Sequence, residues 1–123
     1  MAMANTATIT ATFAYSDPLS SDELIPPDIS ATIATVGYTR LKQSIATSST
    51  AINLGALSTP TWAIFINRDP TNYIELKVSS SGAIFAKMLP GEWCILRLGS
   101  GAQVPYAIAN SGACLMEFLI CNL

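Results

Sequence analysis

The chain has 123 residues, a formal net charge of −2, 50% hydrophobic residues and only 11% charged residues. This length predicts a single domain, and the high apolar content argues against disorder over the whole chain. Six basic against eight acidic residues exclude nucleic-acid binding through a basic surface. Because the chain contains no histidine, histidine-ligated metal sites and histidine-based catalytic triads are also excluded.

The N-terminal part of the chain differs from the rest in charge and in pattern. Residues 1–30 carry four acidic residues and no base, whereas the remainder carries six bases and four acids. Threonines at positions 6, 8, 10 and 12 alternate with apolar residues, which predicts a strand with one buried face up to Tyr15. Residues 16–28 contain three prolines and these four acids, which predicts a loop or an extended arm.

The body of the chain is predicted to be a series of short strands. Residues 61–66 are apolar on both faces, which indicates a central strand or one whose outer face meets another protein. Residues 73–78 alternate, so that Ile74, Leu76 and Val78 are expected to point inward. Further short or extended strands are expected at about 31–37, 39–48, 51–54, 83–86, 93–98, 104–109 and 113–121.

The turns between these strands indicate the architecture. Pro90 and Gly91 occupy the positions that a type II turn requires between two of the strands. Eight or nine short strands, roughly 8–12 residues apart, are typical of a β-sandwich or a barrel. We therefore divide the chain into an N-terminal strand with an acidic proline-rich arm, residues 1–28, and a β-sandwich body, residues 29–123.

From residue 51 onward the order of motifs resembles a known group of proteins. An aromatic-apolar strand is followed by Asn67-Arg68-Asp69, by Leu89-Pro90-Gly91-Glu92, by Ile95-Leu96-Arg97-Leu98 and by Pro105-Tyr106-Ala107. This order is similar to that of small virion structural proteins of tailed bacteriophages, which are β-sandwich or jelly-roll proteins. The resemblance implies an all-β, antiparallel jelly-roll-like sandwich of about eight strands with an N-terminal extended arm. It also implies a non-enzymatic structural role in capsid cement, head-to-tail adaptor, tail or baseplate.

Targeting and thiol signals favour synthesis in the host cytoplasm. No segment has the ~20 consecutive apolar residues of a membrane helix, and residues 1–13 lack the basic start of a signal peptide. Three cysteines are an odd number for a disulfide framework, so reduced thiols are expected. Cys114 and Cys121 are seven residues apart, which places them on opposite faces of one strand.

The sequence contains a few residues that could bind metal, catalyse glycoside hydrolysis or bind sugars, but each has a simpler structural interpretation. The N-terminal acids do not follow a calcium-loop spacing, and the cysteines lack the four closely spaced ligands of a zinc site. Glu75 and Glu92 could form a glycosidase pair, but surface pairing with Lys77 or Lys87 is favoured. Neither an enzyme nor a cofactor is therefore expected. Trp62, Tyr73 and Trp93 could stack against sugars, although packing in a core or an interface is favoured.

We therefore predict a capsid cement (decoration) protein that binds the shell, through the major capsid protein or other virion proteins, and copies of itself. The alternatives are a tail, neck or baseplate component and a carbohydrate-binding β module. The N-terminal strand is expected either to add to the sheet edge of a neighbouring subunit or to form an edge of its own domain. The candidate interface residues are Ile9, Phe13, Tyr15, Leu19, Leu24, Ile25, Trp62 and Ile64.

Overall fold

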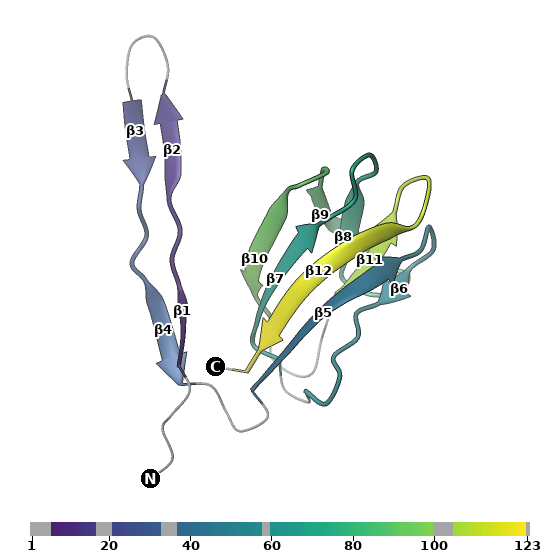
Figure 1. The fold of residues 1–123 in the computed structure, drawn as a ribbon, viewed down its shortest axis with the longest axis horizontal. Coiled ribbons are helices and arrows are strands. Elements are labelled where there is room, and N and C mark those ends of the chain that lie inside the picture. Colours follow the sequence, from purple (N-terminus) through teal and green to yellow (C-terminus); the bar gives the residue numbers. More distant parts are fainter. Residues whose placement is uncertain (1–5, 17–20, 33–36, 58–59, 100–104, 123) are drawn as a thin grey trace.

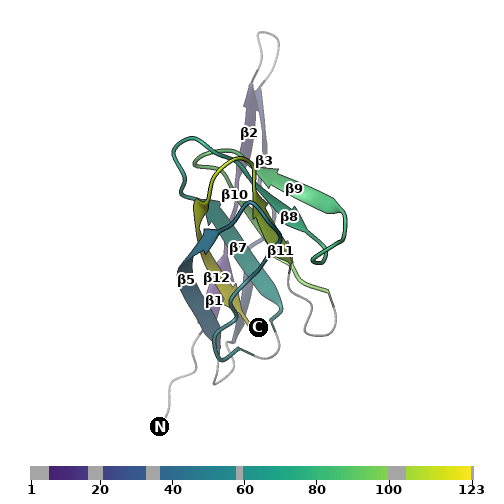
Figure 2. The ribbon, with the colours of Figure 1, turned by 90° about the vertical axis from the view of Figure 1, so that its right-hand side faces the viewer.

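A computed structural model describes residues 6–16, 21–32, 37–57, 60–99 and 105–122, and every regular element within these ranges is a β-strand (Figure 1). Among these residues no helix is long and apolar enough to cross a membrane. Eight strands form a body of two four-stranded antiparallel sheets that face each other (Figure 2). The predicted all-β sandwich of about eight strands is confirmed.

Each sheet of the body brings together strands from distant parts of the sequence, and among the described strands of the body only β8 and β9 are both consecutive in the chain and paired. The first sheet has the order β10 (Trp93–Arg97), β7 (Trp62–Asn67), β12 (Cys114–Cys121) and β5 (Tyr38–Ile45). The second sheet has the order β6 (Thr50–Ala51), β11 (Tyr106–Ala109), β8 (Ile74–Lys77) and β9 (Ile84–Met88).

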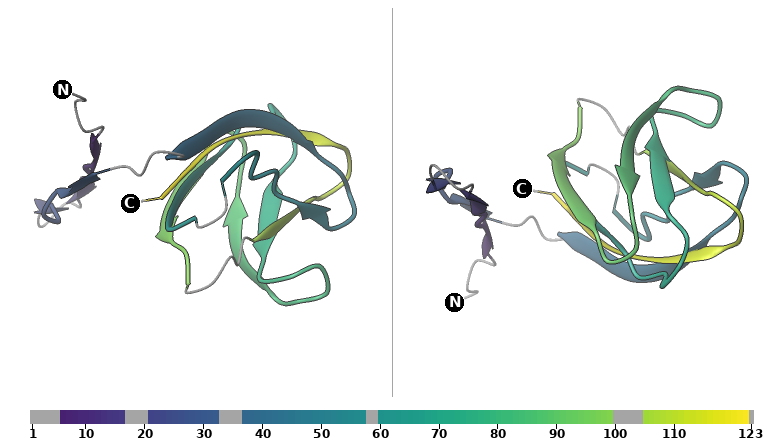
Figure 3. Two further views of the ribbon diagram at one scale, coloured as in Figure 1. Left: turned by 90° about the horizontal axis from the view of Figure 1, so that it is seen from below. Right: turned by 90° about the horizontal axis from the view of Figure 1, so that it is seen from above.

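The strand pairing of the body follows a mirror rule along the chain. The first body strand, β5, pairs with the last, β12, and β6 pairs with β11 in the same way. The next two pairs, β7 with β10 and β8 with β9, continue the rule toward the middle of the chain. The eight strands are therefore paired as one long antiparallel hairpin that is folded over on itself, which produces the two curved layers seen in Figure 3.

Residues 6–16 and 21–32 form a separate structure, which we call the N-terminal hairpin. Its strands are β1 (Thr6–Ile9) with β4 (Ile29–Thr32), and β2 (Phe13–Ser16) with β3 (Ser21–Leu24). Figures 1 and 3 show it standing beside the body, with the β2–β3 end projecting away.

The hairpin corrects three predictions for the N-terminal part. The strand expected up to Tyr15 is interrupted at residues 10–12, and the loop expected at 16–28 contains β3. Since β1 and β2 pair with β4 and β3, the alternative of an edge strand of the body is wrong. The physical reason lies at Pro26 and Pro27, which cannot donate backbone hydrogen bonds. The prolines lie in the unpaired stretch between β3 and β4, so the ladder breaks there but continues on either side.

The core lies between the inner faces of the two sheets. Phe65 of β7 and Phe118 of β12 are cross-strand partners with ring centroids 6.2 Å apart, and both are fully buried. From the second sheet, Ile74 and Leu76 point inward as predicted, whereas Val78 is 55% exposed. The reason is an irregularity in the β8–β9 pairing at Leu76/Lys77, after which the alternation of faces no longer holds. The other large, fully buried side chains of the core are Ile45, Met88, Met116 and Ile120.

One buried polar side chain forms hydrogen bonds to the turns at one end of the sandwich. Asn67, at the end of β7, donates through Nδ2 to the carbonyls of Asn72 and Met88, at 2.9 and 3.0 Å. Its Oδ1 accepts a hydrogen bond from the Asp69 amide, so the buried amide group is satisfied. Gly91 has a φ of 81°, and the Glu92 amide donates to the Leu89 carbonyl, in agreement with the predicted turn.

Replacing Phe118 by alanine is expected to lower the free energy of unfolding by about 3–5 kcal/mol, because it removes a fully buried ring and leaves a cavity. Phe85, which is 47% exposed on β9, is a matched control. Its replacement by alanine should change the free energy by no more than about 1 kcal/mol. Urea unfolding of the two variants measures both values, and equal losses would contradict this assignment of the core.

Candidate functional site

The outer face of the first sheet is unusually apolar for a surface. Along β7, Ala63, Phe65 and Asn67 are buried inward, so Trp62, Ile64 and Ile66 point outward. Directly opposed residues of antiparallel strands share a face, so the pairing register extends this surface across the sheet. It brings Ile95 and Trp93 from β10, Leu119 and Cys121 from β12, and Tyr38 from β5 onto the same side.

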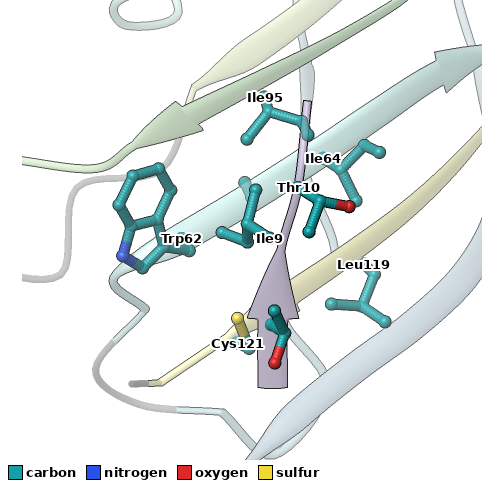
Figure 4. Close-up of a pocket in the computed structure, with 9 residues that line it drawn as sticks. Ile9, Thr10, Trp62, Ile64, Ile95, Leu119 and Cys121 are labelled. Carbon is teal, nitrogen blue, oxygen red and sulfur yellow. The ribbon is translucent and has the colours of Figure 1, made fainter. Parts of the chain in front are cut away.

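A groove runs along this outer face in two connected parts. The larger part has a volume of about 370 Å³ and lies between Thr8, Ile9 and Thr10 of the hairpin and the sheet (Figure 4). The smaller part, of about 190 Å³, lies beside Ile66 and Phe118. Both parts are lined by Ile64 and Leu119 and therefore meet at the centre of the sheet.

A charged cluster lines the smaller part of the groove. Arg40 and Arg68 both bind the carboxylate of Glu117, with nitrogen–oxygen distances of 3.1 and 2.8 Å. These hydrogen bonds, first from Arg68 and then from Arg40, lower the pKa of Glu117 below its ordinary value. The carboxylate side chain is only 11% exposed, whereas Arg40 and Arg68 are 68% and 50% exposed. The cluster therefore presents two guanidinium groups to solvent around one covered acid.

The structure brings together only some of the predicted interface residues. Ile9, Trp62 and Ile64 line the larger part of the groove, and Figure 4 shows Ile9 pointing toward the sheet. Phe13 and Leu24 are cross-strand partners on the hairpin and are 66% and 69% exposed.

The remaining predicted interface residues lie elsewhere on the N-terminal segment. Ile25 follows β3 and is 64% exposed. Tyr15 pairs with Asp22 in the β2–β3 ladder, and Leu19 lies outside the described residues.

Several residues of the groove were not foreseen from the sequence. Ile95 and Leu119 belong to strands that were predicted, but neither residue was predicted to lie at an interface. Arg68 and Glu117 carried no local signal, because they are 49 positions apart in the chain. Only the pairing of β7 with β12 brings them together.

The described residues do not support a glycosidase pair or a metal site. Glu75 lies directly opposite Lys87 in the β8–β9 ladder, as surface pairing requires, although the ion pairs within the described residues join only Arg40 and Arg68 to Glu117. Lys77 donates to Ser49 and to the Ser80 carbonyl, and Lys87 lies 3.9 Å from the centre of the Tyr73 ring. Within the described part of the chain, no three cysteine or acidic side chains lie close enough together to hold a metal ion.

The cysteines occupy the predicted positions on β12. Cys114 faces the core, whereas Cys121 lies on the outer face and lines the groove. Burial raises the pKa of Cys94, Cys114 and Cys121, and the negative charge of Asp69 adds to this effect at Cys114. A raised pKa leaves little thiolate at neutral pH, so these thiols are expected to react slowly.

Comparison with known proteins adds no assignment: no protein-family model, no curated protein and no solved structure matches this chain.

Replacing Glu117 by glutamine is expected to lower the thermal unfolding midpoint at neutral pH. The folded-state pKa lies below the ordinary value of 4.5, so the stabilisation is complete above that value and is lost as the pH falls through the folded-state pKa. Midpoints of the wild type and of Glu117→Gln, measured by circular dichroism, should therefore differ most at neutral pH and converge in acid. A difference that stays constant over the whole pH range would contradict the role of the two arginines.

Alkylation should distinguish buried thiols from a disulfide. With the protein unfolded in denaturant and no reductant present, mass spectrometry should show three modified cysteines. In the folded protein the same reaction should be much slower, because burial disfavours the thiolate. Protection of both Cys114 and Cys121 in denaturant, as a disulfide between them would give, would be incompatible with their positions on opposite faces of β12.

Proposed function

We propose that this protein is a non-enzymatic structural subunit of a tailed-phage virion. Its role is that of a capsid cement (decoration) protein, which binds the shell and copies of itself. The observation that carries the proposal is the apolar groove on the outer face of the first sheet, because this face has the character of a protein interface. In this proposal the protein is located in the virion after synthesis in the host cytoplasm.

The exposed aromatic and aliphatic side chains support a binding role. Trp93 is 57% exposed and Leu115 is 42% exposed, and both lie on the same outer face as the groove. Extended apolar surface of this kind marks interaction sites, and tryptophan is enriched among the residues that dominate binding energy. Exposed Arg40 and Arg68 lie at one end of the apolar part, as polar residues do at the rim of protein interfaces.

The topology supports the finer description of the body as a jelly roll. A jelly roll has eight strands in two sheets, and it occurs in viral capsid and lectin domains. The mirror pairing from β5–β12 to β8–β9 is what such a fold requires. This support adds to the resemblance of residues 51–121 to small virion proteins of tailed phages, although a fold alone does not determine a role.

Two alternatives differ from the cement role in what they bind. A tail, neck or baseplate component would use the same face, but its copy number per particle would be far below that of the major capsid protein. A carbohydrate-binding module would use Trp93 as a stacking platform, and the exposure of this ring is the observation in its favour. The cross-strand neighbour of Trp93 is Ile66, and an aliphatic neighbour favours a protein partner over a sugar.

Purified full-length protein is expected to form homo-oligomers at micromolar concentration, as measured by light scattering. Trp93→Ser should weaken this association or the binding to capsid protein, because it removes an exposed aromatic contact. Phe85→Ser, on β9 of the second sheet, is the control and should leave both unchanged. A stable monomer that binds no capsid or tail protein would overturn the proposed function, and saturable glycan binding to such a monomer would favour the carbohydrate-binding module.

A further inference from the structure

We propose that the smaller part of the groove binds the N-terminal hairpin of a second copy of this chain. The inference rests on the proposed function, since it names the partner and the segment that would hold neighbouring subunits together. It also replaces the expectation that a single strand is added to a sheet edge. The hairpin already pairs its own strands, so it would bind face to face with the sheet.

Each chain places its own hairpin at only one end of its groove. Thr8, Ile9 and Thr10 line the larger part, where β1 lies over the sheet (Figure 4). The residues described around the smaller part, among them Arg40, Ile66 and Leu119, all belong to the body. The groove is therefore continuous from an end that residues of the hairpin line to an end that, among the described residues, only the body lines.

The distal half of the hairpin exposes two large apolar side chains. Phe13 and Leu24 form a cross-strand pair, and both are about two-thirds exposed. An isolated two-stranded hairpin is at best marginally stable in water, so such a pair gains stability from a surface to pack on. Because the β2–β3 end projects away from its own body (Figure 1), these side chains are placed to reach a neighbouring molecule.

The hairpin and the outer face of the first sheet also carry opposite charges. The outer face and its end carry the bases Arg40, Lys42, Arg68 and Arg97 against one acid, Glu117. The hairpin segment carries four acids and no base, and two of these acids, Asp22 and Glu23, lie in β3 beside Leu24. Opposite charges at the rim of an apolar contact favour this docking and select against other partners.

These three features favour a second copy over an unrelated protein. Every copy carries both the acidic, apolar hairpin and the basic-rimmed groove, so each contact made by one subunit can be returned by its neighbour. Such a self-complementary arrangement closes as a dimer or continues around a ring. It buries the apolar residues of both elements without any further protein.

The test is a complementation experiment with two full-length variants. The hairpin variant carries Phe13→Ser and Leu24→Ser and keeps an intact groove. The groove variant carries Ile66→Glu and keeps an intact hairpin. Ile66 is half-buried on the outer face, and glutamate there adds a charge that repels the acidic hairpin. The matched control is Ile108→Glu, because Ile108 is half-buried on β11 of the second sheet.

We expect each variant alone to lose self-association, with a dissociation constant raised about thirtyfold or more, as for the loss of a binding hot spot. Mixed in equal amounts, the two variants should form a one-to-one pair in sedimentation velocity, because one supplies the hairpin and the other the groove. The Ile108→Glu control should associate like the wild type. Thermal melts establish that all three are folded, and if Ile66→Glu does not fold, Ile66→Ser takes its place.

The remaining outcomes separate this inference from the proposed function. If the wild type associates but both variants associate equally well, the hairpin–groove contact is wrong and the structural role stands. If the mixture stays monomeric, the contact is likewise wrong. If the wild type is monomeric but binds a virion protein through the groove, the second-copy assignment is overturned and the proposed function is retained.

Discussion

Strands β7 and β12 carry apolar side chains on both faces. The arrangement of the other elements depends on how each of these two faces is covered. Their inner faces provide Phe65 and Phe118, around which the two sheets close. Their outer faces provide Ile64 and Leu119, which no part of the second sheet can cover. A sandwich buries only one face of each sheet, so the second apolar face calls for another layer. The hairpin supplies part of that layer, and in our proposal neighbouring subunits supply the remainder.

Two kinds of polar interaction keep this apolar framework in register. Asn67 is fully buried, and its hydrogen bonds to Asp69, Asn72 and Met88 leave little freedom to the turns at that end. Glu117 points the other way, to the outer face, where two arginines hold it. A one-residue slip of β7 against β12 would expose Phe65 and would break both arrangements at once. The polar groups thus specify the alignment, whereas apolar burial provides most of the stability.

The parts of the fold that depend on local pattern could be predicted from the sequence. The alternating pattern at Ile74 and Leu76 correctly predicted that these two side chains are buried. The apolar residues on both faces of β7 correctly indicated a central strand. β3 was missed because Ser21, Asp22 and Glu23 are poor strand formers between prolines, and only pairing with β2 makes them a strand. Trp62 and Ile64 were predicted as interface residues from the same local pattern in β7. The charged end of the groove could not be predicted in this way. It forms only when distant strands pair, and no local pattern in the sequence specifies which strands pair.

The pairing of β5 with β12 has a consequence for how the chain acquires its structure. Tyr38 of β5 is opposite Cys121 of β12. The hydrogen bonds of β5, the first strand of the body, can therefore form only after β12, the last strand, has been synthesised. On the ribosome, β5 and β7 emerge well before β12, which inserts between them. Closing such a long loop is entropically costly, and sheets dominated by distant pairs form slowly. The β7–β10 pair can form earlier, but the first sheet is complete only after translation has passed residue 121, and until then the apolar strand edges of β5 and β7 lack their partner.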